Sequence, residues 1–312
     1  MTATMVPKGG VQPSATAPTA GARMPKLSGA HPSTLLTAVM ILALGYYLVP
    51  LVWLVISSTK TQSELFSTPG LSFGSVFALW ENIEHLFAYQ NGVYGWWLLN
   101  TVVYAVASAL GSAVLCAMGG YALAHFDFPG KRVVFAVIVG AVMVPGSVLA
   151  LPIFLLVSQL GLTDTPLAVV LPSVASPFAL YLMTIFAAQS VPRELIEAAR
   201  VDGAGELRIF ASIALRLMSP GLVTITLFQL TAMWNAYFLP LIVLNDDHKF
   251  PLGVGLAQLN ARATQTDSAA AVEGIYPMVM VGSVIAIIPL VIAFLVLQRY
   301  WRAGLATGAV KL

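Results

Sequence analysis

The chain has 312 residues, of which 58% are hydrophobic and only 9% are charged, and its mean hydropathy is +0.87. This composition exceeds the usual apolar share of a soluble domain and predicts a multi-spanning membrane protein. The formal net charge is +2, and the basic residues form no stripe, which argues against nucleic-acid binding. The single cysteine, Cys116, excludes an intrachain disulfide and a multi-cysteine metal site.

The first 34 residues are rich in Ala, Pro, Ser, Thr and Gly and have no apolar pattern that could build a core. We expect them to form a disordered tail. The apolar run that follows, residues 35–57, is longer than the hydrophobic region of a signal peptide and lacks a clear small-residue cleavage site. It is therefore predicted to be the first membrane helix.

Six apolar segments contain no charged residue and are long enough to cross about 30 Å of hydrocarbon at about 1.5 Å per residue. Two prolines interrupt the fourth, which a membrane helix tolerates where neighbours satisfy the freed backbone groups. The sequence thus predicts an all-α domain over residues 35–300 with six transmembrane helices, at residues 35–57, 98–122, 133–157, 167–189, 220–244 and 277–298.

The charges in the loops predict the orientation. If the N-terminus is cytoplasmic, every Lys and Arg except Lys60, Lys249 and Arg262 lies on the inner side, as the positive-inside rule requires. Both termini, including a C-terminal tail of residues 301–312, are then expected in the cytoplasm.

Two loops on the predicted outer side are long. In residues 58–97, apolar residues recur at helical spacing with acidic residues opposite, which predicts an amphipathic helix that either covers the bundle or contacts an outer partner. The second loop, 245–276, contains Asp246, Asp247 and His248. Adjacent residues rarely converge on one ion, so no metal site is expected there.

Charge is concentrated in one polar segment within residues 190–216, between the fourth and fifth spans. Each of its arginines would cost about 2.5 kcal/mol in hydrocarbon, so the segment must lie in water or against a partner. Pro192 favours a helix start, Glu194 in the first turn suits the helix dipole, and Gly203 supplies a stop. A second amphipathic stretch, from Ile209 to Leu217, is expected along the membrane surface.

Within this helix, Ala198 and Ala199 would let a partner's backbone approach closely, and the carboxylate of Glu197 could pair with a partner's arginine. A surface segment without a partner is the alternative.

Catalytic patterns are missing from the sequence. Residues 128–132, FPGKR, lack the spacing and the hydroxyl of a nucleotide-binding P-loop, and there is no H-E-x-x-H pattern. The predicted spans contain no Asp, Glu, His, Lys or Arg from which a proton relay or voltage sensor could be built. We expect a non-catalytic subunit.

Neutral polar residues in the spans suit the passage of a neutral, hydroxyl-rich solute. The candidates are Tyr121 in the second span and Gln229, Trp234 and Asn235 in the fifth, with Gln229 and Asn235 the better placed. Hydrogen bonding between helices is the alternative, and it is favoured for most of the polar groups in these spans.

The polar segment resembles the sequence signature of a known family. Glu197, Ala198 and Ala199, followed at fixed spacing by Gly203, Ile213 and Leu215, resemble the EAA signature of inner-membrane permease subunits of binding-protein-dependent ABC importers. Arg216 departs from that signature, where Pro is usual. Further motifs are similar to the carbohydrate-uptake branch, in particular to the smaller maltose permease subunit: YALA (121–124), FPGKR (128–132), MVP (143–145), LP (151–152), DGA (202–204), WN (234–235), LPL (239–241) and the stretch 304–311.

The resemblance implies an inner-membrane, multi-pass subunit that pairs with a second homologous permease. Two cytoplasmic ATPase subunits would bind ATP and Mg²⁺, and an extracytoplasmic binding protein would deliver a sugar, so this chain would hold no cofactor of its own. It also implies that the coupling residues toward the ATPase are Glu197, Ala198, Ala199, Asp202 and Gly203.

Other functions stay open at this point. The same machinery could carry another polar solute, such as a glycerol phosphodiester or a polyol. A self-contained channel or facilitator is compatible with six uncharged spans, although the polar segment would then have no purpose.

Overall fold

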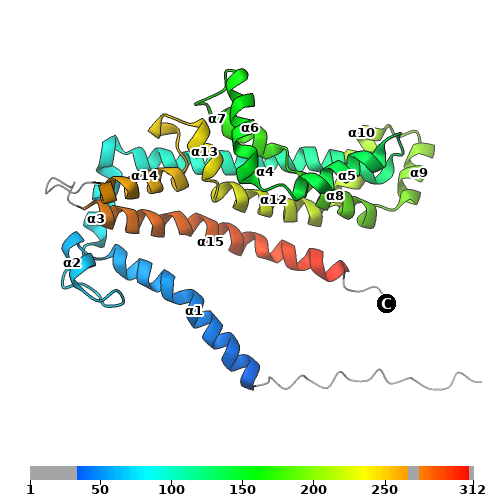
Figure 1. The fold of residues 1–312 in the computed structure, drawn as a ribbon. Coiled ribbons are helices and arrows are strands. Elements are labelled where there is room, and N and C mark those ends of the chain that lie inside the picture. Colours follow the sequence, from blue (N-terminus) through cyan, green and yellow to red (C-terminus); the bar gives the residue numbers. More distant parts are fainter. Residues whose placement is uncertain (1–33, 266–273, 309–312) are drawn as a thin grey trace, which may run out of the picture. The chain divides into compact units, whose positions relative to one another are not determined.

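The computed structural model describes residues 34–265 and 274–308, and every regular element in these ranges is helical (Figure 1). The all-α prediction is confirmed. The predicted N-terminal tail, apart from Thr34, and the last four residues of the predicted C-terminal tail lie outside the described residues. The α-helices are α1 (Thr34–Ser58), α2 (Gln62–Ser67), α3 (Leu79–Ala88), α4 (Val93–His125), α5 (Lys131–Val142), α6 (Gly146–Gln159), α7 (Pro166–Val174), α8 (Pro177–Ser190), α9 (Arg193–Val201), α10 (Glu206–Ile209), α11 (Leu215–Leu217), α12 (Ser219–Trp234), α13 (Phe238–Val243), α14 (Leu252–Gln265) and α15 (Ile275–Gly308).

The chain divides into two compact units, and the boundary falls inside α1 between Val49 and Pro50. Residues 34–49 form an uninterrupted apolar helix without a charged side chain. The elements from Pro50 onward form the second unit, which holds all the features described below.

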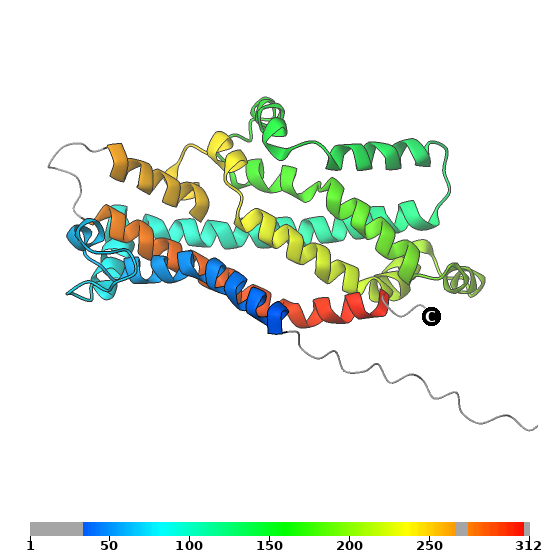
Figure 2. The ribbon, with the colours of Figure 1, turned by 60° about the horizontal axis from the view of Figure 1, so that its bottom comes forward.

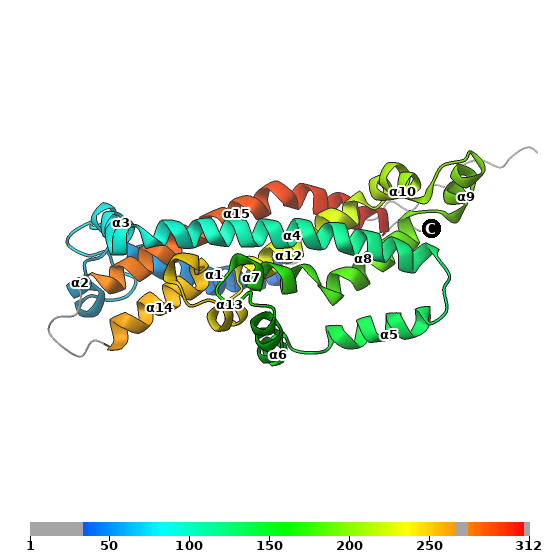
Figure 3. The same cartoon turned by 90° about the horizontal axis from the view of Figure 1, so that it is seen from above.

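The centre of the second unit is α4, whose 33 residues span about 50 Å at about 1.5 Å per residue. Helices α8 and α12 pack along it, as Figure 3 shows. Close approach depends on Gly120, because a Cβ there would lie 2.7 Å from the backbone of Met183 in α8. Small residues at such contacts allow membrane helices to pack without a hydrophobic driving force.

Three of the predicted spans, the third, fourth and fifth, are interrupted. The apolar stretch 133–157 forms α5 and α6, which meet at 109° around residues 143–145. The prediction of one continuous third span was therefore wrong. Pro145 caps the start of α6, and its missing N–H and fixed φ interrupt a helix that hydropathy alone shows as continuous.

The predicted fifth span, 220–244, was also wrong in extent. Helix α12 ends at Trp234, and α13 follows after a break. At its other end, α12 meets the segment Glu206–Leu217 at 77°. Pro220, in the first turn of α12, marks this entry, although Arg216 replaces the proline that the family signature carries earlier.

Within residues 34–265 and 274–308, four helical segments are long and apolar enough to cross a membrane, or six if each of two bent pairs counts as one span. Among them, Pro166–Ser190 combines α7 and α8 across a break at residues 175–176, where the Ser176 hydroxyl accepts a hydrogen bond from the amide of Ala179. The upper count agrees with the six predicted spans.

The second unit has two distinct ends. Helices α9 and α10 lie at one, called here the α9 end, and α2, α3 and α14 lie at the other, called the α3 end (Figure 1). The C-terminal part of α15 runs toward the α9 end in both Figure 1 and Figure 2. The helix predicted in the first long loop is confirmed as α3, but its faces differ from the predicted pattern, because Asn82 is buried beside Leu86 whereas Trp80 is 74% exposed.

Candidate functional site

The polar segment folds into a short helix with a defined start and stop. Pro192 precedes the first turn of α9, and the helix ends where Gly203 adopts a left-handed conformation with φ of +80°. The amide of Gly203 donates to the carbonyl of Arg200, and the amide of Ala204 donates to that of Ala199. These two bonds form a Schellman motif, which satisfies carbonyls that the helix end leaves free.

One side chain anchors α9 to the bundle. Ile196 is buried and packs in an apolar cluster with Val191, Ile209 and Met218. This cluster also includes residues of α4, α8 and the segment before α12. Because the cluster is closely packed, a displacement of α9 would shift the residues that it contacts on all three.

Arg200 adds a polar brace. Its Nε lies 2.6 Å from Oε1 of Glu206 in α10, and its guanidinium stands 5.8 Å from the ring centre of Phe126, just beyond α4. The carboxylate of Glu206 raises the pKa of Arg200 further above its ordinary value. The brace therefore joins α9, α10 and the end of α4.

The opposite face of the segment is open and partly apolar. Glu197, Ala198, Asp202 and Gly203 are exposed and Ala199 is partly exposed. Beside them, Val201 is 87% and Leu207 is 77% exposed, although the segment is otherwise rich in charge. Exposed apolar residues bordered by charged residues are typical of protein interaction surfaces.

Tyr121 lies beneath this surface and not near the other pathway candidates. Its ring is buried in the same cluster as Ile196, with the ring centre of Phe210 5.4 Å away and that of His125 5.1 Å away. Trp234 belongs to a separate apolar cluster. The structure thus connects Tyr121 to the α9 segment, because Phe210 opens the π-helical turn Phe210–Ala214 between α10 and α11.

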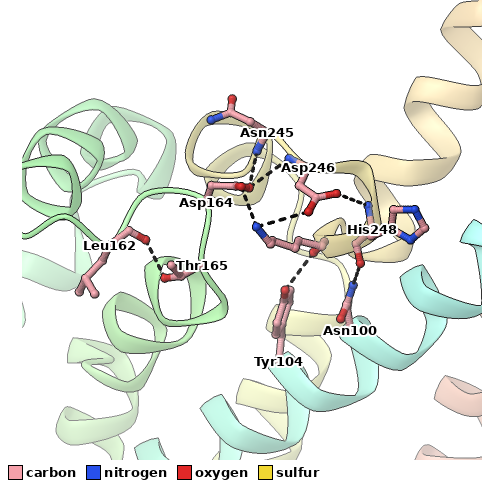
Figure 4. Close-up of polar contacts among 9 residues, drawn as sticks. Asn100, Tyr104, Leu162, Asp164, Thr165, Asn245, Asp246 and His248 are labelled. Carbon is pink, nitrogen blue, oxygen red and sulfur yellow. Dashed lines mark hydrogen bonds and ion pairs between the residues drawn. The ribbon is translucent and has the colours of Figure 1, made fainter.

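A second set of polar contacts joins the turn between α6 and α7, the loop after α13 and helix α4 (Figure 4). Asp164, in the turn between α6 and α7, accepts hydrogen bonds from the amides of Asn245 and Asp246 at 2.9 and 3.0 Å. Its other oxygen lies 2.7 Å from Nζ of Lys249. The ammonium of Lys249 and the two amides lower the pKa of Asp164 to about 2.

Side chains of α4 hold the same loop from below. The Tyr104 hydroxyl donates to the carbonyl of Lys249 at 2.9 Å, and the Asn100 amide donates to that of His248 at 2.7 Å. Trp97 donates to the carbonyl of Asp247, and Thr101 accepts from the amide of Leu252. Asn100, Thr101 and Tyr104, which lie in the second predicted span, therefore hold this loop in place. Their hydrogen bonds are contacts within the fold.

The sequence profile of one protein family matches residues 116–306, and that family is described as the inner membrane component of binding-protein-dependent transport systems. The chain belongs to this family. It is therefore a multi-pass membrane permease.

Individual relatives agree with this membership. The arabinooligosaccharides transport system permease protein AraQ of Halalkalibacterium halodurans is 35% identical over 84% of this chain and 90% of its own length. The sn-glycerol-3-phosphate transport system permease protein UgpE of Yersinia pestis is 29% identical over 85% and 93%. A bacterial ABC transporter involved in import of the acidic polysaccharide alginate shares the fold, with a TM-score of 0.71 at 22% identity, over 86% of this chain and 96% of that one.

In this permease, the side chains of two predicted pathway residues form hydrogen bonds between helices. The side-chain amide of Gln229 donates to the carbonyl of Ser173 in α7, and the indole of Trp234 donates to that of Ala286 in α15 at 3.2 Å. Both bonds fit the structural interpretation of neutral polar residues in membrane spans.

Asn235 is placed differently. It lies at the break between α12 and α13, is exposed, and donates to the carbonyl of Thr231 at 2.8 Å. One turn earlier, Thr231 borders an apolar groove of about 300 Å³ between α12 and α15, which Leu230 and Phe294 also line. Asn235 and Thr231 therefore remain open to a solute or a second subunit.

The residues that the sequence did not single out are those whose partners are distant in the chain. Asp164 with Lys249, and Arg200 with Phe126, become recognisable only when the helices pack. The left-handed conformation of Asp164, with φ of +58°, is the kind of local feature that Asp tolerates better than most residues.

Proposed function

We propose that this permease imports a sugar, delivered by an extracytoplasmic binding protein, and that partner ATPase subunits drive it through α9. The observation that carries the proposal is the two-faced α9 segment. Ile196 and Arg200 fix one face to the bundle, while the other presents Glu197, Val201 and Leu207 to a partner.

The orientation follows from the charges. The α9 end carries the arginines of the polar segment. Lys60 lies just before α2, Lys249 just before α14 and Arg262 within α14, and α2 and α14 belong to the α3 end. By the positive-inside rule the α9 end and both termini are cytoplasmic. The binding protein would then meet the α3 end, and ATP with Mg²⁺ would be held by the ATPases below α9.

The geometry supports a mechanical role for this chain. ATPase subunits that close on ATP would carry the exposed face of α9 with them. Ile196 and the Arg200 brace would pass that displacement to Tyr121 and Phe210, and so to α4 and to the bend before α12. The chain's own contribution is to convert a movement at its cytoplasmic surface into a change of access along α12.

The proposed solute is neutral and rich in hydroxyls. The apolar spans contain no charged side chain, and the open polar groups near the break after α12 are an amide and a hydroxyl, of Asn235 and Thr231. Such groups pair with sugar hydroxyls without a charge to neutralise. The relative with arabinooligosaccharides in its name supports the same class.

An organic phosphate is the second candidate, because one relative is named for sn-glycerol 3-phosphate. A phosphate dianion would be expected to meet arginine or lysine on its path. Since the spans of this chain carry neither, such a site would have to come from the second permease.

The test is uptake by proteoliposomes that contain this chain with its partner permease, ATPases and binding protein. We expect uptake of a labelled oligosaccharide only with internal ATP and binding protein, and no uptake with Glu197→Lys despite normal membrane insertion. Glu84→Lys, at the other end, is the matched charge control. Uptake without ATPases would identify a facilitator, and preferential uptake of a glycerol phosphate would replace the proposed solute class.

A further inference from the structure

Residues 61–80, called here the 61–80 loop, expose an unusual number of large apolar side chains. Phe66 is 70%, Phe73 is 65% and Trp80 is 74% exposed. Leu71, Val76 and Phe77 are exposed as well. The loop includes α2 and the first residues of α3, at the α3 end of the bundle (Figure 1).

Lys60, which directly precedes this loop, is buried, and Glu64, within the loop, is partly exposed; both side chains are hydrogen-bonded to the loop. The carboxylate of Glu64 accepts hydrogen bonds from the amide and the hydroxyl of Ser75, at 2.7 and 2.6 Å, and from the hydroxyl of Thr61. The ammonium of Lys60 is 1% exposed and donates to the Thr68 hydroxyl and the Pro69 carbonyl, both at 2.9 Å. No other charged residue occurs between Lys60 and Glu81.

The loop is also closed at its base. The amide of Ala78 donates to the carbonyl of Thr59 at 2.8 Å, and the side chain of Asn82 donates to the carbonyls of Ser58 and Lys60. The result is a compact loop whose charged groups are hydrogen-bonded internally and whose aromatic rings are exposed. This matches the requirement that charged groups near hydrocarbon be satisfied internally.

The tip of the loop folds back along the membrane helix. A Cβ added to Gly70 would lie 2.8 Å from Nε1 of Trp53. Trp53 precedes the end of α1 at Ser58 by five residues, or about 7 Å of helix. The exposed apolar surface of α1 around Trp53, with Val52 and Val55, thus continues without a break into the loop.

We propose that the 61–80 loop inserts into the phospholipid leaflet at the α3 end and anchors this end of the permease at the boundary between headgroups and acyl chains. Aromatic side chains favour that boundary because they are apolar with a polarisable or polar edge. A phospholipid surface is the occupant that fits, because the patch is continuous with a membrane-spanning helix and the charged groups beside it are already hydrogen-bonded to the loop.

Site-directed spin labelling of the full chain in phosphatidylcholine and phosphatidylglycerol liposomes tests this. Nitroxides are attached at Phe73→Cys and Phe77→Cys in a Cys116→Ala background, with Glu84→Cys on α3 as the matched control. We expect the labels at 73 and 77 to collide more often with oxygen than with water-soluble nickel chelate, and the label at 84 to show the opposite preference.

Two results would overturn the proposal. Labels at 73 and 77 that collide mainly with the nickel chelate would place the loop in water, and labels shielded from both reagents would show that protein covers it. Quenching by brominated phospholipid gives a check without cysteine variants, since Trp80→Phe should remove part of the quenched fluorescence of the unmodified chain. None of these measurements needs ATP, sugar or a partner, so their outcome is independent of the proposed transport function.

Discussion

The ring centre of Tyr121 in α4 lies 5.4 Å from that of Phe210, the first residue of the π-helical turn before α12, and the two rings are tilted by 51°. This contact connects α4 with the segment that follows α9. Single π-helical turns often occur at functional sites, where they interrupt the regular ladder of a helix.

The Tyr121 ring is predicted to transmit movement, whereas its hydroxyl is not needed. The hydroxyl is buried and finds no hydrogen-bond partner among the described residues. Tyr121→Phe should therefore keep transport and raise stability by about 1 kcal/mol. Tyr121→Ala leaves a cavity, should cost about 3 kcal/mol of stability, and should lower the sugar transported per ATP hydrolysed.

The number of sugars transported per ATP, measured in proteoliposomes beside thermal unfolding, separates these effects. A Tyr121→Ala protein that loses stability but keeps the wild-type ratio would show that the ring only supports the fold.

The left-handed conformation of Gly203 is predicted to be required for the orientation of α9. A Cβ at this position would meet no atom within 4 Å, so any effect of substitution comes from the backbone alone. Gly203→Val should cost about 1–2 kcal/mol and strongly lower transport, because a β-branched residue avoids positive φ.

Gly203→Asn is the matched variant, since Asn adopts this conformation more readily. We expect it to retain most of the transport activity. Equal uptake by the Val and Asn variants would contradict a conformational role for this residue.

The Asp164 contact predicts a pH dependence of stability. Its pKa is lowered from 3.8 to about 2 in the folded chain, so the carboxylate stabilises the fold above about pH 4, and this contribution is lost as the pH falls to about 2. Because both side chains of the pair are about one third exposed, the contribution is small, on the order of 1 kcal/mol.

Asp164→Asn keeps a residue that tolerates the positive φ and removes the charge. Thermal unfolding in detergent should show a lower Tm for the variant at pH 7, with the difference disappearing toward pH 2. A difference that is constant over this range would mean that the charge of Asp164 is not responsible.

Asn235 and Gln229 are predicted to differ in their effects. Asn235→Leu replaces an exposed amide at the break after α12 and should alter the KM or the sugar preference of uptake with assembly unchanged. Gln229→Leu breaks a bond to α7 and should chiefly lower stability, by about 1 kcal/mol. Kinetic parameters that are unaffected by Asn235→Leu would exclude it from the pathway.

How much the sequence could predict depended on whether the signal is local. The start of α9 at Pro192 and its stop at Gly203 were predictable, because capping preferences reside in a few adjacent residues. Helix α3 was predictable for the same reason, since its pattern repeats within one segment.

The breaks in the membrane segments were not predictable from hydropathy. Residues 133–157 are apolar throughout, so a scale of composition cannot show the 109° bend at Pro145. Similarly, the neutral polar character of Tyr121 does not reveal that its ring packs against Phe210, and the pairing of Asp164 with Lys249 depends on two loops that meet only in the folded chain.

We propose that the exposed face of α9 is cytoplasmic and is covered by an ATPase. Val201→Cys, at a position that is 87% exposed, can be labelled with a membrane-impermeant maleimide in a Cys116→Ala background. We predict labelling in inverted membrane vesicles stripped of ATPase, strong protection when the ATPase is added back, and no labelling in intact cells. Labelling from outside intact cells would contradict the cytoplasmic placement of this face. An equal labelling rate with and without the ATPase would contradict its cover by the ATPase.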